Sequence, residues 1–177
     1  GGGTGLVIAV CSNPTCTSST RRVLDQRSGR QSSIAIGADN KPIISYAVDD
    51  ASGDPDHPDN TLLVAACADT TCSSTTITSL GVLLTQPGDS TFERGTQIAI
   101  GTDDKPVIVF TDSDGNVGVA ECSATDCSTG ATISTIANAG TRASVSLAIR
   151  DSDNARIITY VDPGASGSLK IAVLSAP

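Results

Sequence analysis

The chain repeats itself, and this repetition constrains its fold more than any other feature. Four segments resemble "LLVAAC" in their order of apolar residues, and they begin at Leu6, Leu62, Val117 and Leu169. A second pattern recurs between them as "SIAIGADNKPIISY", "QIAIGTDDKPVIVF" and "SLAIRDSDNARIITY". A spacing of about 52–56 residues is typical of repeat architectures, in which one supersecondary unit is used several times.

Each repeat contains four short apolar or β-branched runs and no helical periodicity. In the best-preserved unit the runs are Ser33–Gly37, Pro42–Val48, Leu62–Cys67 and Thr75–Leu80, and turn residues separate them. Runs of this kind predict β-strands. Four consecutive antiparallel strands in each repeat are the pattern of a β-propeller blade.

The repeats divide one domain, residues 1–177, into a half-blade, two blades and a partial blade. Residues 6–24 supply a third and a fourth strand, 33–80 and 97–136 supply complete blades, and 146–174 supply the first three strands of another. The stretch 25–32 is expected to be a connection between strands. The fold class predicted is therefore all-β, a propeller-like array of about three four-stranded antiparallel blades.

The expected thirteen strands make three four-stranded blades and one further strand. Closed propellers are built from about 4–8 blades, so this array would stay open. Exposed strand edges pair readily with another chain. We therefore expect strand complementation between copies, in which the first two strands of 146–174 join residues 6–24 of another copy. The alternative is that these residues are an excerpt of a longer repeat array.

Three expectations concern individual strands. The first strand of each blade, next to the propeller axis, is expected to be buried on both faces. One aromatic residue in each blade, at Tyr46, Phe110 and Tyr160, is expected to pack between neighbouring sheets. The fourth strand is rich in threonine, as in "TTITSL", and is expected to be exposed.

All six cysteines occur in one spacing, Cys-x4-Cys. The pairs are Cys11–Cys16, Cys67–Cys72 and Cys122–Cys127. Three local disulfides would indicate an oxidising compartment, extracellular or at a cell surface. A zinc site made by these thiols is the alternative, but it needs four ligands and the chain has one histidine, His57.

The repeat as a whole resembles those of secreted bacterial β-propeller proteins that carry a Cys-x4-Cys in each four-stranded blade. The resemblance covers nearly the whole chain and implies a fold but no particular activity. The unit 146–174 departs from the pattern. Arg150 replaces the glycine, Ala155 and Arg156 replace Lys-Pro, and Leu174 replaces the first cysteine.

Acidic loops are the candidates for ligand binding. The longer connections share one end of the strands, and variable loops on a rigid scaffold often bind ligands. One of them carries Asp49, Asp50, Asp54, Asp56 and Asp59. These residues form either a calcium site or a solvated acidic loop, and the second interpretation is favoured.

The segment Asp112–Asn116 allows the same two interpretations. Asp112, Asp114 and Asn116 alternate as in the first half of an EF-hand loop, but the glycine is displaced and Ser123 stands where the loop needs a glutamate. Asp-Gly is also a hairpin signal, so a turn is favoured over a calcium site. No other cofactor is indicated.

Composition excludes several classes of function. Eleven basic against nineteen acidic residues give a net charge of −8, which disfavours nucleic acid as a partner, and no apolar run is long enough to insert into a membrane. No catalytic Ser/His/Asp set can be built around His57, and tryptophan is absent. We therefore expect a non-catalytic extracellular structural or adhesive protein that assembles with itself into rings or filaments. A carbohydrate-binding propeller module that recognises surface glycans is the alternative, and a hydrolase is the weaker one.

Overall fold

The computed structural model describes residues 5–48, 60–84, 95–140, 143–162 and 167–176. Within these ranges the regular structure is β-strand throughout, and no helix could cross a membrane. The strands are β1 (Gly5–Cys11), β2 (Ser19–Ile36), β3 (Pro42–Val48), β4 (Thr61–Cys67), β5 (Thr75–Leu83), β6 (Gln97–Ile100), β7 (Pro106–Thr111), β8 (Asn116–Cys122), β9 (Ala131–Asn138), β10 (Val145–Arg150), β11 (Ala155–Asp162) and β12 (Ser168–Leu174).

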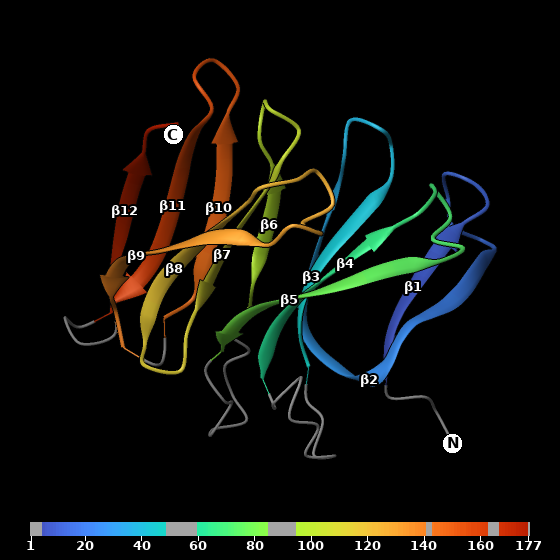
Figure 1. The fold of residues 1–177 in the computed structure, drawn as a ribbon, viewed down its shortest axis with the longest axis horizontal. Coiled ribbons are helices and arrows are strands. Elements are labelled where there is room, and N and C mark those ends of the chain that lie inside the picture. Colours follow the sequence, from blue (N-terminus) through green and yellow to red (C-terminus); the bar gives the residue numbers. More distant parts are fainter. Residues whose placement is uncertain (1–4, 49–59, 85–94, 141–142, 163–166, 177) are drawn as a thin grey trace.

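The strands form three antiparallel sheets, each a meander in chain order. The first sheet contains β1 to β5, the second β6 to β9 and the third β10 to β12. Figure 1 shows the sheets side by side, with β1 and β2 at one end of the row and β12 at the other. The all-β, antiparallel fold predicted from the repeats is confirmed.

The expectation of a loop at residues 25–32 is wrong. β2 runs without a break from Ser19 to Ile36: its first half pairs with β1 and its second half with β3. The described residues therefore form twelve strands rather than thirteen, and β2 makes residues 6–24 part of the same sheet as β3, β4 and β5. The sequence "DQRSGRQS" has no strand-like alternation, and the ladder is irregular between Arg30 and Ser33, where Gln31 has a positive φ. The strand therefore follows from the ladders on either side.

Neighbouring sheets pack face to face through apolar side chains. One cluster joins the first and second sheets, with Ile43, Leu62 and Val64 against Ile108 and Phe110. A second cluster joins Val107, Val109, Val117 and Val119 of the second sheet to Ile158 of the third. A third cluster lies within the first sheet, because β2 turns Leu6 of β1 back onto Ile44, Tyr46 and Leu63.

The middle strands, not the first ones, are buried on both faces. Every residue of β3, β4 and β7 is buried, whereas the first strands of the sheets alternate or are half exposed. Ile34 and Ile36, in the second half of β2, are more than half exposed. The expectation of a fully buried first strand is therefore wrong, because such a strand is covered only where a complete neighbouring sheet faces it.

The expectation that the aromatic residues pack between neighbouring sheets is confirmed for Phe110 and Tyr160, whereas Tyr46 packs between two layers of the first sheet. Tyr46 and Phe110 are almost completely buried between layers, and Tyr160 packs against the cluster between the second and third sheets. Phe110 lies directly opposite Gly118 on β8. A methyl group at Gly118 would lie 2.4 Å from Cζ of the Phe110 ring, so this position has room only for glycine.

The threonine-rich fourth strands are exposed, as expected. β9 is half buried or exposed along its whole length, and so is β5. Threonine suits such a strand because its branched side chain favours extended backbone and its hydroxyl group remains hydrated.

All six cysteines are paired in three local disulfides: Cys11–Cys16, Cys67–Cys72 and Cys122–Cys127. In each loop the second cysteine has a positive φ, at Cys16, Cys72 and Cys127. The three loops therefore have the same backbone turn, and the predicted staples are present.

Exposure separates the three disulfides into two classes. Cys11 and Cys16 are exposed, whereas Cys72 and Cys127 are buried almost completely. We expect dithiothreitol to reduce Cys11–Cys16 first, because thiol exchange needs access to the sulfur. Peptide mapping after timed alkylation would measure the order. Simultaneous reduction of all three bonds in the folded protein would contradict it.

Candidate functional site: two open faces

The face presented by β1 and β2 exposes large apolar side chains. Val7, Val23, Ile34 and Ile36 are each at least 44% exposed. β1 is hydrogen-bonded only to β2 among the described strands, so its other edge has no ladder partner there. We call this surface the head face.

The head face is hollowed beside β1. A cavity of about 390 Å³ lies between β1 and the second half of β2. Its lining consists of Leu6, Val7, Ile8, Ala9, Leu24, Ser32, Ser33, Ile34 and Ile44. Most of this lining is apolar, and it borders the strand edge without a ladder partner.

The opposite end of the row also exposes apolar side chains. On β12, Leu169, Ile171 and Val173 are 60–67% exposed. On β11, Ile157 and Val161 point the same way and are half buried. We call this surface, made by the outer sides of β10, β11 and β12, the tail face.

The internal repeats show how such faces are covered elsewhere. Ile98 on β6 is equivalent to Ile34, and it is only 8% exposed because the first sheet packs on it. On the other side, Ile43 and Val107 are equivalent to Ile157 and are buried by the sheet that follows. Ile34 of the head face and Ile157 of the tail face therefore occupy repeat positions that are covered by a neighbouring sheet elsewhere in the chain.

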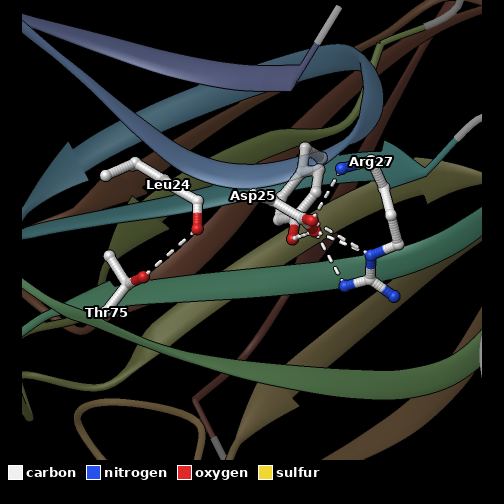
Figure 2. A network of polar contacts seen from close by, with 5 residues as sticks. Leu24, Asp25, Arg27 and Thr75 are labelled. Carbon is white, nitrogen blue, oxygen red and sulfur yellow. Dashed lines mark hydrogen bonds and ion pairs between the residues drawn. The ribbon is translucent and has the colours of Figure 1, made fainter.

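A buried polar network fixes the head face to the rest of the first sheet. Figure 2 shows the carboxylate of Asp25, on β2, clasped by the guanidinium group of Arg27, with Nη2 to Oδ2 at 2.7 Å and Nε to Oδ1 at 3.0 Å. The hydroxyl group of Tyr46 donates to Oδ2 of Asp25 at 2.6 Å. Beside it, the Thr75 hydroxyl of β5 donates to the carbonyl oxygen of Leu24 at 3.5 Å.

This network lowers the pKa of the Asp25 carboxyl group. Burial alone would raise that pKa, but hydrogen bonds from Arg27 and Tyr46 and the charge of Arg27 together lower it further than burial raises it. The same burial and the neighbouring carboxylate raise the pKa of Tyr46, which therefore stays a hydrogen-bond donor.

The lowered pKa has a consequence for acid stability. A carboxyl group with a depressed folded-state pKa stabilises the fold above its unfolded pKa of about 3.9, and this contribution is lost as pH falls through the folded-state value. We expect the wild type to exceed Asp25→Asn in unfolding free energy at pH 7, and the difference to shrink below about pH 4. Urea denaturation at pH 7 and pH 3 would measure it; an unchanged difference would contradict the assignment.

Asp112–Asn116 forms a closed turn. Oδ1 of Asp112 accepts hydrogen bonds from the backbone N–H groups of Asp114 and Asn116, and Oδ2 accepts one from the Asn116 side chain. The carboxylate of Asp112 is therefore directed at its own turn. Among the described residues no cluster of three His, Cys, Asp or Glu side chains could hold a metal ion.

The other predicted binding residues, Asp49, Asp50, Asp54, Asp56 and Asp59, lie outside the described residues, and so does His57. Sequence reasoning missed Asp25 and Arg27, because it placed them in a loop. The sequence signal that could have identified them is the acidic Asp25 between Arg22 and Arg27, at a position that corresponds to the end of a strand in the other repeats. It also missed Ile34 and Ile36, which it took as buried.

Comparisons with known proteins show the fold and no family. No protein-family model and no curated protein matches the chain. A protein of unknown function from Dyadobacter fermentans matches with a TM-score of 0.55 and 13% identity over 95% of this chain. An endo-arabinase from Bacteroides thetaiotaomicron matches with a TM-score of 0.50 and 13% identity over 98% of it. A fucose lectin from Kordia zhangzhouensis gives a TM-score of 0.48 at 7% identity, covering 82% of this chain and 93% of the lectin.

This chain spans 48% of the Dyadobacter protein and 66% of the arabinase. The three disulfides fit an extracellular or otherwise oxidising environment. The face-packed antiparallel sheets, together with the likeness to the first two structures, identify an all-β, propeller-like fold.

Proposed function

We propose that this protein is a non-catalytic extracellular building block whose copies assemble head to tail. The observation that carries the proposal is the exposure of Ile34 and Ile36, since the equivalent Ile98 and Ile100 are covered by a preceding sheet. Exposed apolar patches of this kind mark interaction surfaces. A second copy supplies a surface of the required kind, because its tail face is equivalent to the face that covers Ile98.

In the proposed contact, β10 and β11 of one copy lie over the head face of the next. Ile157 then covers the region of Ile34 and Ile36, and β1 of the next copy pairs with β11 in place of β12. This exchange preserves the ladder, because "LVIAV" of β1 and "LKIAV" of β12 are nearly the same sequence. The side chains of Val7 and Ala9 point away from the first sheet in a single copy. After the exchange they occupy the positions of Lys170 and Ala172, on the side of the third sheet that faces the second sheet.

Strand exchange favours association because β1 brings more contacts than β12. β12 is paired on one edge, to β11, and leaves three large apolar side chains in solvent. β1 arrives already bonded to β2, so the completed sheet gains a fourth strand. Head-to-tail contacts of this type close into a ring or continue as a filament, depending on the rotation at each interface.

Substitutions on the two faces test the proposal. We expect wild-type protein to form oligomers in multi-angle light scattering after gel filtration, and Ile34→Asp and Ile157→Asp to run as monomers. Ile133→Asp is the matched control, because Ile133 is 41% exposed on β9 and lies on neither face. Circular dichroism would verify that each variant is folded.

A substitution in β12 separates strand exchange from simple stacking of the tail sheet. Ile171→Asp should leave assembly intact or strengthen it, because β12 gives up its place on β11. If Ile171→Asp abolishes assembly while Ile34→Asp does not, strand exchange is wrong. A wild type that remains monomeric at all concentrations tested would refute self-assembly altogether.

A further inference from the structure

A small cleft with four charged residues in its lining lies between the second and third sheets, away from the head and tail faces. It has a volume of about 330 Å³. It is lined by Asp103, Lys105, Pro106, Val107, Glu121, Cys122, Ser123, Thr132 and Arg156. The lining contains two opposite-charge pairs, Asp103–Lys105 at 3.7 Å and Glu121–Arg156 at 2.6 Å. Pro106 and Val107 lie buried at its base.

Arg156 is the unusual residue of the cleft. It is 2% exposed, its Nη2 contacts Glu121 and its Nη1 donates to the carbonyl oxygen of Asn154 at 2.9 Å. Its Nε is buried and has no hydrogen-bond partner among the described residues. Buried donors are nearly always satisfied in native proteins, so Arg156, a residue that lines the cleft, keeps an unused guanidinium N–H that a small side-chain shift would make available to a ligand.

The preceding repeat provides an internal comparison. The equivalent cleft, between the first and second sheets, has a volume of about 230 Å³ and retains Asp39, Lys41 and Thr76. It has Ala66 and Ala68 where this cleft has Glu121 and Ser123.

Two further differences distinguish this cleft. Arg156 stands at the repeat position that proline holds in the first two sheets, at Pro42 and Pro106. Thr125 and Asp126 of a disulfide loop line the preceding cleft, whereas Leu174 replaces the cysteine that such a loop would need here. The departures from the repeat thus converge on one cleft, where they add the Glu121–Arg156 ion pair and enlarge the volume from about 230 to about 330 Å³.

We propose that this cleft binds a neutral pyranose through two adjacent hydroxyl groups. One hydroxyl donates to the carboxylate of Glu121, and its neighbour accepts from the guanidinium group of Arg156, which lies within 2.6 Å of that carboxylate. A neutral ligand is favoured over an anion because the four charged groups of the lining cancel.

The residues that line the cleft come from one copy, but the proposed assembly would bring the Cys11–Cys16 loop of the next copy beside it. The test therefore uses the Ile34→Asp background, which keeps the chain unassembled. If the chain does not assemble at all, this substitution changes only an exposed side chain, so failure of one proposal leaves the other open to test.

The probes are the methyl glycosides of D-mannose and D-galactose, with their fully O-methylated forms and D-glucuronate as controls. We expect saturation-transfer NMR and calorimetric titration to detect at least one of the two glycosides and neither control. The double variant Glu121→Ala, Arg156→Pro copies the preceding cleft and should weaken binding about ten- to a hundredfold. The matched control Thr76→Ala, in the preceding cleft, should leave affinity unchanged.

Three outcomes would overturn the proposal. Absence of binding by both glycosides would remove the sugar site. Undiminished binding by the double variant, with its fold verified by circular dichroism, would place the site elsewhere. Binding of D-glucuronate without binding of either glycoside would show that the cleft takes an anion and not a neutral sugar.

Discussion

Replacing Phe110 by alanine should lower the free energy of unfolding by about 3–5 kcal/mol. The ring is 2% exposed and fills the space between the first and second sheets, so its loss leaves a cavity that rigid sheets cannot close. Gly118→Ala should also destabilise, by about 1–3 kcal/mol, because its methyl group would overlap the ring.

The two substitutions should not be additive. In the double variant the methyl group added by Gly118→Ala occupies part of the space that Phe110 leaves, so the combined loss should be smaller than the sum of the two single losses. Urea denaturation of the four proteins would measure the coupling. Additive losses would show that the ring does not lie against Gly118.

Replacing Asp25 by alanine should cost about 3 kcal/mol or more, because hydrogen bonds to a charged group contribute about 1.5–3 kcal/mol each and the Tyr46 hydroxyl would remain buried without its acceptor. Thr75→Val is the matched control. It removes only the 3.5 Å hydrogen bond to Leu24, and should cost less than about 1 kcal/mol.

The stability lost through Asp25→Ala should be partly restored by a second substitution, Tyr46→Phe. In Asp25→Ala, Tyr46→Phe the hydroxyl group that would lose its acceptor is absent, so this double variant should be more stable than Asp25→Ala alone. If Asp25→Ala unfolds no more readily than Thr75→Val, the network does not hold β2 in place.

The same substitution connects stability to assembly. Asp25 lies at the middle of β2, between the half that carries β1 and the half that carries Ile34. Loosening this point should disturb the head face before it disturbs the second and third sheets, which have their own ladders and core. Hydrogen exchange would show this as faster exchange confined to β1 and β2.

The repeats made most of the fold predictable. Strand positions, antiparallel meanders, the packing of Phe110 and Tyr160 and the three staples all follow from local patterns that recur in each unit. Recurrence is informative because a pattern that appears several times cannot be a chance feature of one segment.

The errors arose where tertiary context overrides local sequence. "DQRSGRQS" resembles a loop, but pairing of β1 on one side and β3 on the other extends it into β2. Ile34 and Ile98 occupy the same repeat position, yet one is exposed and the other buried, because burial depends on the neighbouring sheet and not on the strand itself. In the sequence, the cleft between the second and third sheets was visible only as isolated departures from the repeat at Arg156 and Leu174. The fold brings Arg156 beside Glu121.

A mixing experiment tests head-to-tail assembly most directly. Ile34→Asp has a damaged head face and an intact tail face, and Ile157→Asp has the reverse. In native mass spectrometry each variant alone should be monomeric, and the equimolar mixture should form a one-to-one heterodimer and no larger species, because only one intact interface can form. A mixture that stays monomeric, or homodimers of either single variant, would contradict the account.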